Sequence, residues 1–168
     1  YFYQYNFCKK RISVVKKAII FGANGQDGYY LTKLLEEDNI AVIGVSRKGD
    51  FLKIDLSSYA EVSALVQVHK PEYIFHLATN STTRHDVIFE NHETISTGTL
   101  NILESVKNYS PETKVFISGS GLQFVNQNKP INETDAFEAR DAYSVSRIHT
   151  VYAARYYRRL GIKTYVGY

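Results

Sequence analysis

The sequence predicts an α/β fold, a doubly wound parallel sheet with helices on both faces. Two observations support this prediction. Short apolar runs typical of buried strands alternate along the chain with segments of helical periodicity. Three glycines, Gly22, Gly25 and Gly28, stand at every third position where the first apolar run meets the first helical segment. Alternation of this kind needs crossover connections, which place the helices on the faces of a parallel sheet.

The composition is that of one globular domain with a real core. Of 168 residues, 44% are hydrophobic and 22% are charged, which excludes a disordered chain. The net charge is only +3 and the charges are scattered, so neither nucleic acid nor a membrane is favoured as a partner. The single cysteine, Cys8, and the lack of a recognisable signal peptide predict a reducing, cytoplasmic setting.

Residues 1–16 form an extension rich in aromatic and basic side chains. We expect this extension to pack on its own domain or on a partner subunit, because exposed aromatic patches usually mark protein contacts. Stacking on nucleic-acid bases is the alternative interpretation. Residues 17–168 then make up the sheet domain.

The expected strands are the apolar runs at 17–21, 40–45, 51–54, 73–77, 114–117 and 162–166. Helical spacing of Leu31, Leu34 and Leu35 predicts a helix directly after the glycines. Ser57 and Ser58 can cap the next helix, which carries apolar side chains at 62, 65 and 66. Longer helices are expected over 89–106 and 142–160, the second of them stopped by Gly161.

The glycine-containing loop has the properties of a dinucleotide-binding turn. Gly22 permits the tight turn, Gly25 lets the backbone approach a pyrophosphate, and Gly28 lets the helix pack against the strand. The free N–H groups at the start of the helix then face the anion. An ordinary glycine-rich turn is the alternative. The strand before the loop and the helix after it favour dinucleotide binding.

The end of the second strand indicates which dinucleotide is bound. An acidic residue there binds the free 2′-hydroxyl of NAD, whereas arginine accommodates the 2′-phosphate of NADP. Here Arg47 and Lys48 follow the strand, and no carboxylate comes before Asp50. These cations favour NADP, unless the turn is merely basic and solvated. Asp55, after the third apolar run, is a candidate to bind the adenine amino group.

Several motifs resemble the extended short-chain dehydrogenase/reductase superfamily, and within it the GDP-mannose 4,6-dehydratases. The resemblance runs from about residue 17 to 168 and is carried by the motifs at 22–28, 75–78, 98–103, 132–134 and 137–143. It implies a Rossmann-type fold, bound NADP and a nucleotide-sugar substrate, with a GDP-sugar favoured. The implied cofactor-binding residues are Gly22, Asn24, Gly25, Gln26, Asp27, Gly28, Arg47, Lys48, Asp55, Leu56, Leu77, Ala78, Tyr143 and Arg147.

The resemblance also implies the catalytic residues. In that superfamily a Ser/Thr–Tyr–Lys group moves a proton while a hydride is transferred. Here Tyr143 and Arg147, four residues apart on one helix face, fall at the tyrosine and lysine positions. Other tyrosines have a lysine four residues later, but only Tyr143 follows the fifth expected strand, at the carboxyl edge where such sheets bind ligands.

The chain departs from this pattern at three places. Arg147 replaces the lysine, and Ile95 falls where an asparagine is common. Glycine occupies positions 119 and 121, where the hydroxyl and the dehydratase glutamate of the family fall. Ser118 and Ser120 flank these positions and are candidates to substitute. Without an acid/base at 121, a keto-reductase or epimerase reaction is an alternative to water elimination.

Two classes of function follow. The first is an NADP-dependent nucleotide-sugar dehydratase, epimerase or reductase that transfers hydride at sugar C4. The second is a homologue that binds the cofactor but has weakened or lost catalysis, with a regulatory or structural role. The histidines show no metal-ligand spacing, so no metal site is predicted. We also expect a longer natural polypeptide with a separate substrate lobe, and a homo-oligomer is possible.

Overall fold

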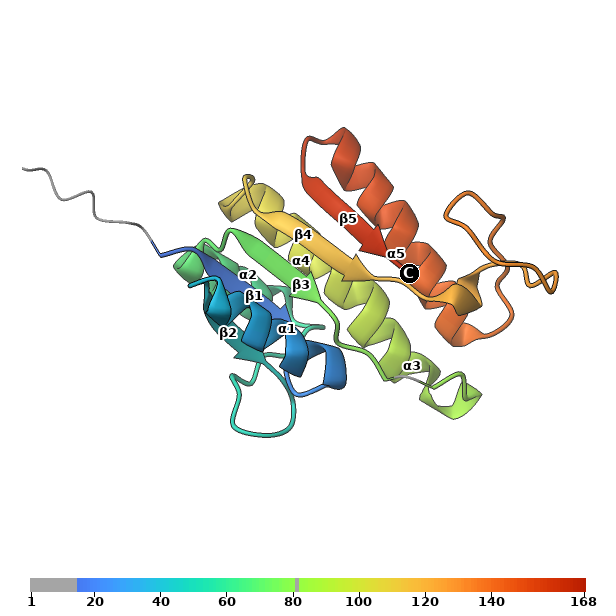
Figure 1. The fold of residues 1–168 in the computed structure, drawn as a ribbon, viewed down its shortest axis with the longest axis horizontal. Helices are drawn as coiled ribbons and strands as arrows, with labels where there is room; N and C mark the ends of the chain where they lie inside the picture. Colours follow the sequence, from blue (N-terminus) through green and yellow to red (C-terminus); the bar gives the residue numbers. More distant parts are fainter. Residues whose placement is uncertain (1–14, 81) are drawn as a thin grey trace, which may run out of the picture.

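The computed structural model describes residues 15–80 and 82–168, and within them a five-stranded parallel sheet forms the centre of the molecule (Figure 1). The strand order is β2-β1-β3-β4-β5. The strands are β1 (Lys17–Phe21), β2 (Ala41–Val45), β3 (Tyr73–His76), β4 (Lys114–Ser118) and β5 (Lys163–Gly167). The predicted parallel α/β fold is therefore confirmed. The predicted extension 1–16 lies almost entirely outside the described residues.

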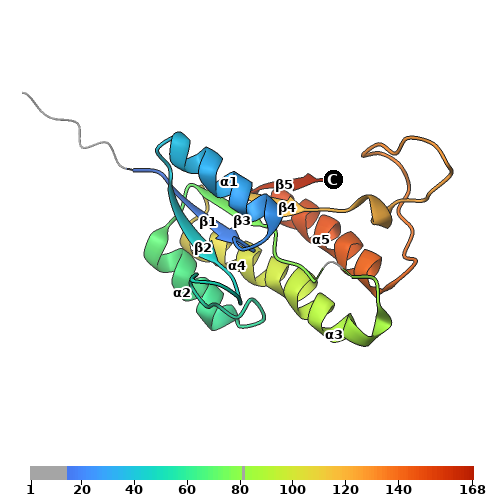
Figure 2. The same cartoon turned by 60° about the horizontal axis from the view of Figure 1, so that its bottom comes forward.

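Helices cover both faces of this sheet, as Figure 2 shows. On one face lies α1 (Gln26–Glu37), and on the other lie α2 (Tyr59–His69), α4 (Gly98–Tyr109) and α5 (Ala142–Arg159). Shorter helical segments are η1 (His85–Val87), α3 (Ile88–Asn91), the π-helix η2 (His92–Thr97) and η3 (Gly121–Gln123). In the part of the chain that the structure describes, no helix has an apolar stretch of membrane-spanning length.

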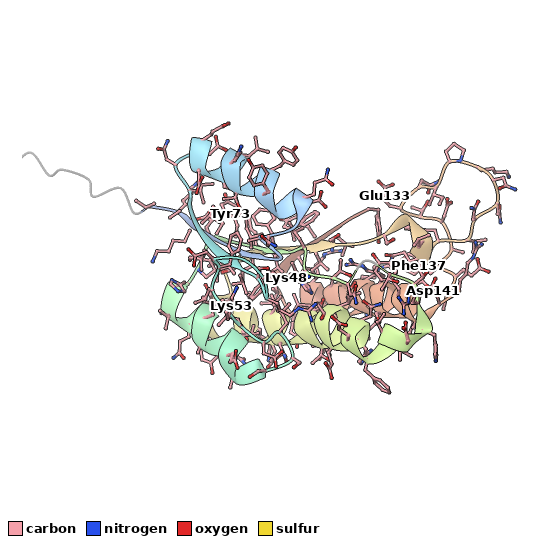
Figure 3. All side chains as sticks on the ribbon, turned by 90° about the horizontal axis from the view of Figure 1, so that it is seen from below. Lys48, Lys53, Tyr73, Glu133, Phe137 and Asp141 are labelled. Atoms are coloured by element: carbon pink, nitrogen blue, oxygen red, sulfur yellow. The ribbon has the colours of Figure 1, made fainter. Side chains whose placement is uncertain are left out.

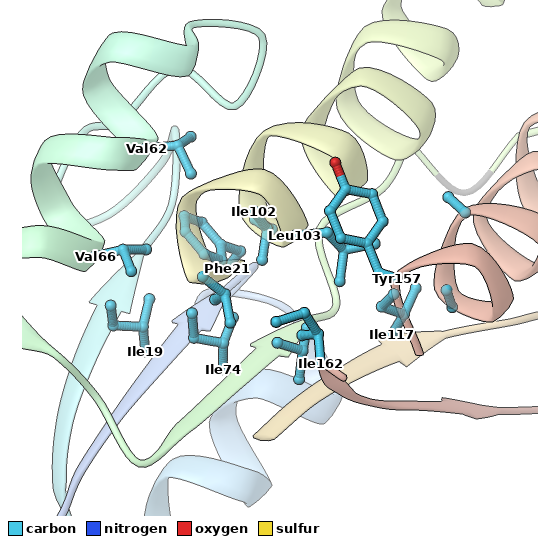
Figure 4. Close-up of a cluster of buried hydrophobic side chains, with 14 of the residues drawn as sticks. Ile19, Phe21, Val62, Val66, Ile74, Ile102, Leu103, Ile117, Tyr157 and Ile162 are labelled. Carbon is cyan, nitrogen blue, oxygen red and sulfur yellow. The ribbon is translucent and has the colours of Figure 1, made fainter. Parts of the chain in front are cut away.

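The larger hydrophobic core lies between the sheet and helices α2, α4 and α5 (Figure 4). Ile19 and Phe21 of β1 point into it, whereas Ala18 and Ile20 point to the opposite face, under α1. All four are fully buried. This alternation follows from the two-residue period of a strand, and burial on both faces explains why β1 is a continuous apolar run. β1 is therefore an interior strand that is buried on both faces of the sheet.

The strand predicted at 51–54 is wrong. Only Leu52 pairs with the sheet, through a single parallel bridge to Val45 at the edge of β2. The ring of Phe51 lies against Gly44, within 2.7 Å of where a β-carbon would stand, and so covers β2 instead of extending the edge. The chain then turns towards the cap of α2, and residues 15–80 and 82–168 form five strands where six were expected.

Two helix predictions need correction. Helical spacing places Leu34 on one side of α1 with Leu31 and Leu35, but Leu34 is 60% exposed while Leu35 is buried. The helix predicted over 89–106 is α3, η2 and α4 in succession. In η2 the hydrogen bonds widen to the π pattern, and the N–H of Gly98 donates to the carbonyl of Glu93, five residues earlier. Such π segments are frequent at functional sites.

The predicted helix ends at α2 and α5 are confirmed. The hydroxyl of Ser58 accepts a hydrogen bond from the N–H of Glu61 and caps α2. Gly161 follows the end of α5 with φ at +90°, a left-handed conformation that glycine adopts at little cost. At the start of α5 the carboxylate of Asp141 accepts from the N–H of Ser144 at 2.7 Å. This cap fixes the first turn of the helix that carries Tyr143.

Candidate functional site

A cleft of about 1250 Å³ opens at the carboxyl ends of β1, β2 and β3. Strand β1 pairs with β2 on one side and with β3 on the other. The connection after β1 therefore runs to one side of the sheet, and the connection after β2 returns to the other side. Ligands of open α/β sheets bind at such a switch point. The structure brings the predicted dinucleotide-binding residues together along this cleft: Gly22, Asn24, Gly25, Gln26, Asp27, Gly28, Arg47, Lys48, Asp55, Leu56, Leu77, Ala78, Tyr143 and Arg147.

The glycine loop leaves no space for side chains at two of its three glycines. Gly22 has φ at +96°, and a β-carbon there would lie 2.7 Å from the amide nitrogen of Ala78. A β-carbon on Gly28 would lie 2.4 Å from the carbonyl oxygen of Gly22. Gly25 is different, because its hypothetical β-carbon meets only that same carbonyl, at 3.3 Å. This contact is tight but less severe than those at Gly22 and Gly28, and the missing side chain leaves the cleft open at Gly25.

The beginning of α1 faces the cleft with unsatisfied backbone donors. Gly25 is the N-cap residue and supplies no side chain to bond the first N–H groups of this twelve-residue helix. Together with the positive end of the helix dipole, such N–H groups suit a pyrophosphate. The open position at Gly25 and these free donors fit the dinucleotide that the sequence predicts.

Cations gather on the segment after β2, where the adenosine ribose is expected. Arg47 and Lys48 line the cleft, and so does Lys53, which no pattern in the sequence singled out. Figure 3 labels Lys48 and Lys53 on this segment. Lys53 Nζ donates to the carbonyls of Ser46 at 3.1 Å and Gly49 at 2.5 Å, which closes the loop between them. Lys53 could be found from the sequence only by knowing that this loop folds back on itself.

Arg47 is not free in the structure. Its guanidinium forms an ion pair with Glu90 of α3 at 2.8 Å, across the cleft. No periodicity of the sequence points to Glu90, because it stands 43 residues further along the chain. Asp55 also lines the cleft, and its Oδ1 accepts hydrogen bonds from the N–H and the hydroxyl of Ser57. These bonds fix the orientation of the carboxylate, and its contact with adenine stays a prediction.

Tyr143 and Arg147 meet on the inner face of α5. The Nε–H of Arg147 donates to the phenolic oxygen of Tyr143 at 3.1 Å, and its Nη1 donates to the carbonyl of Ser118 at the end of β4. Both side chains are largely buried, Arg147 at 2% exposure, yet both border the cleft. A buried guanidinium bonded to the phenol can stabilise a phenolate and so assist proton transfer.

The segment after β4 brings only one of the two candidate serines to the cleft. Ser118 lines the cleft, but its hydroxyl lies 3.4 Å from the carbonyl of Gly119. Ser120 does not line the cleft, and its hydroxyl accepts from the N–H of Leu122, capping η3. Gly119 is packed by Tyr168, whose ring occupies the space where a side chain would stand. Of the two serines, only Ser118 is therefore brought to the cleft.

Close to Arg147 lies His76, the last residue of β3, which is fully buried. Neither of its ring nitrogens has a hydrogen-bond partner within the described part of the chain. Burial, and then the positive charge of Arg147, lower the pKa of His76 from 6.5 to about 4, against an opposing effect of backbone groups of Thr94 and Ile95. His76 is therefore neutral at pH 7 and adds no second charge beside Arg147.

Residues 15–80 and 82–168 contain no cluster of three acidic, histidine or cysteine side chains that could hold a metal ion. Ile95, at the position where the resembled superfamily commonly has an asparagine, is completely buried within η2.

Curated relatives of this chain include sugar-nucleotide dehydratases. GDP-mannose 4,6 dehydratase 1 of Arabidopsis thaliana is 28% identical over 163 residues, covering 79% of this chain and 45% of that protein. GDP-mannose 4,6-dehydratase of Yersinia enterocolitica is 30% identical over 173 residues, covering 86% and 46%. The chain thus spans about half the length of the curated relatives it matches.

Solved structures share the fold. The UDP-Glc/GlcNAc 4-epimerase of Campylobacter jejuni superposes with a TM-score of 0.82 at 17% identity, covering 90% of this chain and 52% of that one. The UDP-glucose 4-epimerase of Brucella ovis, solved in complex with NAD, gives 0.81 at 18% identity, covering 90% and 51%. These likenesses confirm the Rossmann-type fold. The model of the NAD dependent epimerase/dehydratase family matches residues 18–167, and the chain belongs to that family.

Proposed function

We propose that this chain binds NADP in the cleft and serves hydride transfer at C4 of a nucleotide sugar, with a GDP-sugar favoured. The observation that carries the proposal is the single cleft that joins the glycine loop to the Tyr143–Arg147 pair. Relatives of the chain are named for GDP-mannose, which supports the choice of sugar nucleotide. The same proposal includes a cytoplasmic location and a homo-oligomer, as the sequence suggests.

The free donors at the start of α1 would hold the pyrophosphate, and Arg47, Lys48 and Lys53 would surround the adenosine ribose. The family is named for NAD, and the related structure from Brucella ovis was solved with NAD, so the choice of NADP rests on the residues of this chain. The cluster of three cations supports NADP, because the 2′-phosphate of NADP is negatively charged whereas the 2′-hydroxyl of NAD is not.

Nicotinamide, when bound, supplies or accepts the hydride. In the reducing direction Tyr143 gives its phenolic proton to the C4 carbonyl oxygen of the sugar, which becomes a hydroxyl. The Nε–H of Arg147 then stabilises the phenolate. In the oxidising direction the phenolate takes the proton from the C4 hydroxyl. Arg147 keeps its own proton throughout, so it holds charge rather than relaying protons.

A weakened catalyst is the second candidate function. Gly119 supplies no hydroxyl to the developing alkoxide, and a lost donor of this kind costs on the order of a hundredfold in rate. Gly121 supplies no carboxylate, and it does not line the cleft. These departures favour reductase or epimerase chemistry over water elimination, and they also suit a homologue whose main task is to bind the cofactor.

A single-turnover measurement tests the proposal. NADPH bound to the protein is mixed with a 4-keto GDP-sugar, and loss of nicotinamide absorbance is followed for the unmodified protein and for Tyr143→Phe. We expect slow oxidation that falls at least a hundredfold in the variant while NADPH affinity is kept. Equal rates for both proteins would show that Tyr143 is not the proton donor. Binding of NADPH without any oxidation would favour the second candidate.

A further inference from the structure

We infer that Glu90 is a specificity-determining residue that restrains the preference of the cleft for a 2′-phosphate. The inference rests on the proposed function, because it concerns how the adenosine end of the same cofactor is bound. It starts from the ion pair between Arg47, which follows β2, and Glu90 of α3. These two residues are 43 positions apart and reach the cleft from opposite walls.

The carboxylate of Glu90 is held from two sides. Its Oε1 lies 2.8 Å from Nη1 of Arg47, and its Oε2 accepts a hydrogen bond from Nδ2 of Asn80 at 3.3 Å. Asn80 follows β3 and lines the same cleft. A carboxylate that bonds both neighbours has a defined place at the mouth of the cleft and is not a freely moving surface charge.

This arrangement makes Glu90 a competitor for Arg47. A 2′-phosphate would use the same guanidinium, and two anions at one site repel each other. Binding NADP therefore requires Glu90 to give up its bond to Arg47 or to remain beside a second anion. NAD carries a 2′-hydroxyl, which brings no charge and can donate to a carboxylate. Glu90 thus lowers the affinity for NADP more than the affinity for NAD.

The size of the effect follows from exposure. The side chains of Arg47 and Glu90 are 67% and 39% exposed, so solvent screens their interaction. Lys48 and Lys53 lie on the same wall and have no such carboxylate contact in the described structure, so they continue to favour a phosphate. We therefore expect Glu90 to reduce the preference for NADP and not to reverse it.

The test compares the ratio of dissociation constants for NAD and NADP, measured by calorimetry at low salt. Glu90→Gln keeps the size of the side chain and an oxygen that can accept the hydrogen bond from Nδ2 of Asn80, but it removes the charge. We expect the ratio to shift towards NADP by roughly two- to tenfold, and the shift to shrink at high salt. In an Arg47→Ala background, the shift caused by Glu90→Gln should be smaller, because the competition for the guanidinium is gone and only the direct effect of the carboxylate on the phosphate remains.

Asp86→Asn is the matched control. Asp86 is also an exposed carboxylate paired with an arginine, Arg84, and it lies four residues before Glu90 without lining the cleft. It should not change the ratio. An unchanged ratio in Glu90→Gln, or the same shift in Asp86→Asn, would overturn the role of Glu90 while cofactor binding stands. If the unmodified protein binds neither dinucleotide, the proposed function and this inference both fail.

Discussion

The ring of Tyr168 lies against Gly119, so close that a β-carbon on Gly119 would stand 2.5 Å from Cδ1 of the tyrosine. The same β-carbon would be 2.9 Å from the carbonyl of Gly167, which already accepts the N–H of Gly119 at 2.6 Å. Phe124 holds the tyrosine in place with an edge-to-face contact, its ring centre 4.9 Å away. Glycine at 119 is thus explained by packing across β4 and β5.

Restoring a hydroxyl at position 119 should therefore destabilise the protein. Gly119→Thr is expected to lower the free energy of unfolding by about 1–3 kcal/mol, the usual cost of overpacking. Adding Tyr168→Ala should recover part of this loss by opening the space. Urea unfolding of the single and double variants measures both effects.

Gly121→Thr is the control for this pair, since a β-carbon at 121 would have no heavy atom within 4 Å. Its free energy of unfolding should change by less than about 1 kcal/mol. If Gly119→Thr is as stable as Gly121→Thr, Tyr168 does not restrict position 119.

The glycine loop allows stability and cofactor binding to be separated. Gly25 has φ at −77° and ψ at 168°, which alanine adopts easily, and its β-carbon would meet only the carbonyl of Gly22 at 3.3 Å, so Gly25→Ala should cost less stability than Gly28→Ala. Its methyl group would nevertheless stand where the pyrophosphate approaches, and NADP affinity should fall tenfold or more.

Gly28→Ala should instead lose about 1–3 kcal/mol of stability, because of its clash with the carbonyl of Gly22. Thermal unfolding and calorimetry together distinguish these outcomes; full cofactor affinity in Gly25→Ala would contradict the predicted binding mode.

Local patterns carried most of what the sequence could predict. The strand–glycine–helix junction around Gly25 depends only on neighbours in the chain, so it was recognisable. The spacing of Tyr143 and Arg147 occurs elsewhere in the sequence, and only its place after an expected strand and the family resemblance singled this pair out. The pairs Arg47–Glu90 and Gly119–Tyr168 were not recognisable, because each joins residues more than 40 positions apart whose contact depends on packing.

The wrong predictions have the same origin. The apolar run 51–54 could form an edge strand or a loop, and its sequence does not distinguish the two. In the structure it is a loop, and the ring of Phe51 covers Gly44 of β2. Likewise, Leu34 and Leu35 are neighbours in the chain, and apolar spacing alone could not tell that Leu35 would be buried and Leu34 exposed.

The cap of α5 should affect catalysis as well as stability. Asp141 bonds the first turn of the helix, and Tyr143 stands in that turn. Asp141→Ala should cost about 1 kcal/mol in the free energy of unfolding and should also slow hydride transfer, because a frayed first turn no longer fixes the phenol. Ser58→Ala removes the corresponding cap of α2 and should cost similar stability with no change in that rate. Equal rates for the two variants would mean that the cap does not position Tyr143.

His76 should make the protein sensitive to acid. Its pKa in the folded state, about 4, lies below the ordinary value of 6.5, so the unfolded chain binds the proton more readily. Stability is therefore complete above about pH 6.5 and decreases as the pH falls towards 4, by at most about 1.4 kcal/mol per pH unit. Below pH 4 both states are protonated and this contribution levels off. His149, whose pKa is also lowered by burial, acts in the same direction but is less buried.

His76→Leu should remove most of this dependence, because leucine has no proton to gain and fills a site that offers no hydrogen bond. The measurement is the free energy of unfolding at pH 7.5, 6, 5 and 4.5 for the unmodified protein, His76→Leu and His149→Leu. Between pH 7.5 and 4.5 the loss should be smallest in His76→Leu and intermediate in His149→Leu. The leucine at 76 will itself change stability at pH 7.5, so the slope with pH, rather than the absolute value, carries the result. A slope in His76→Leu equal to that of the unmodified protein would mean that the pKa of His76 is not lowered in the folded state. Other groups would then cause the acid sensitivity.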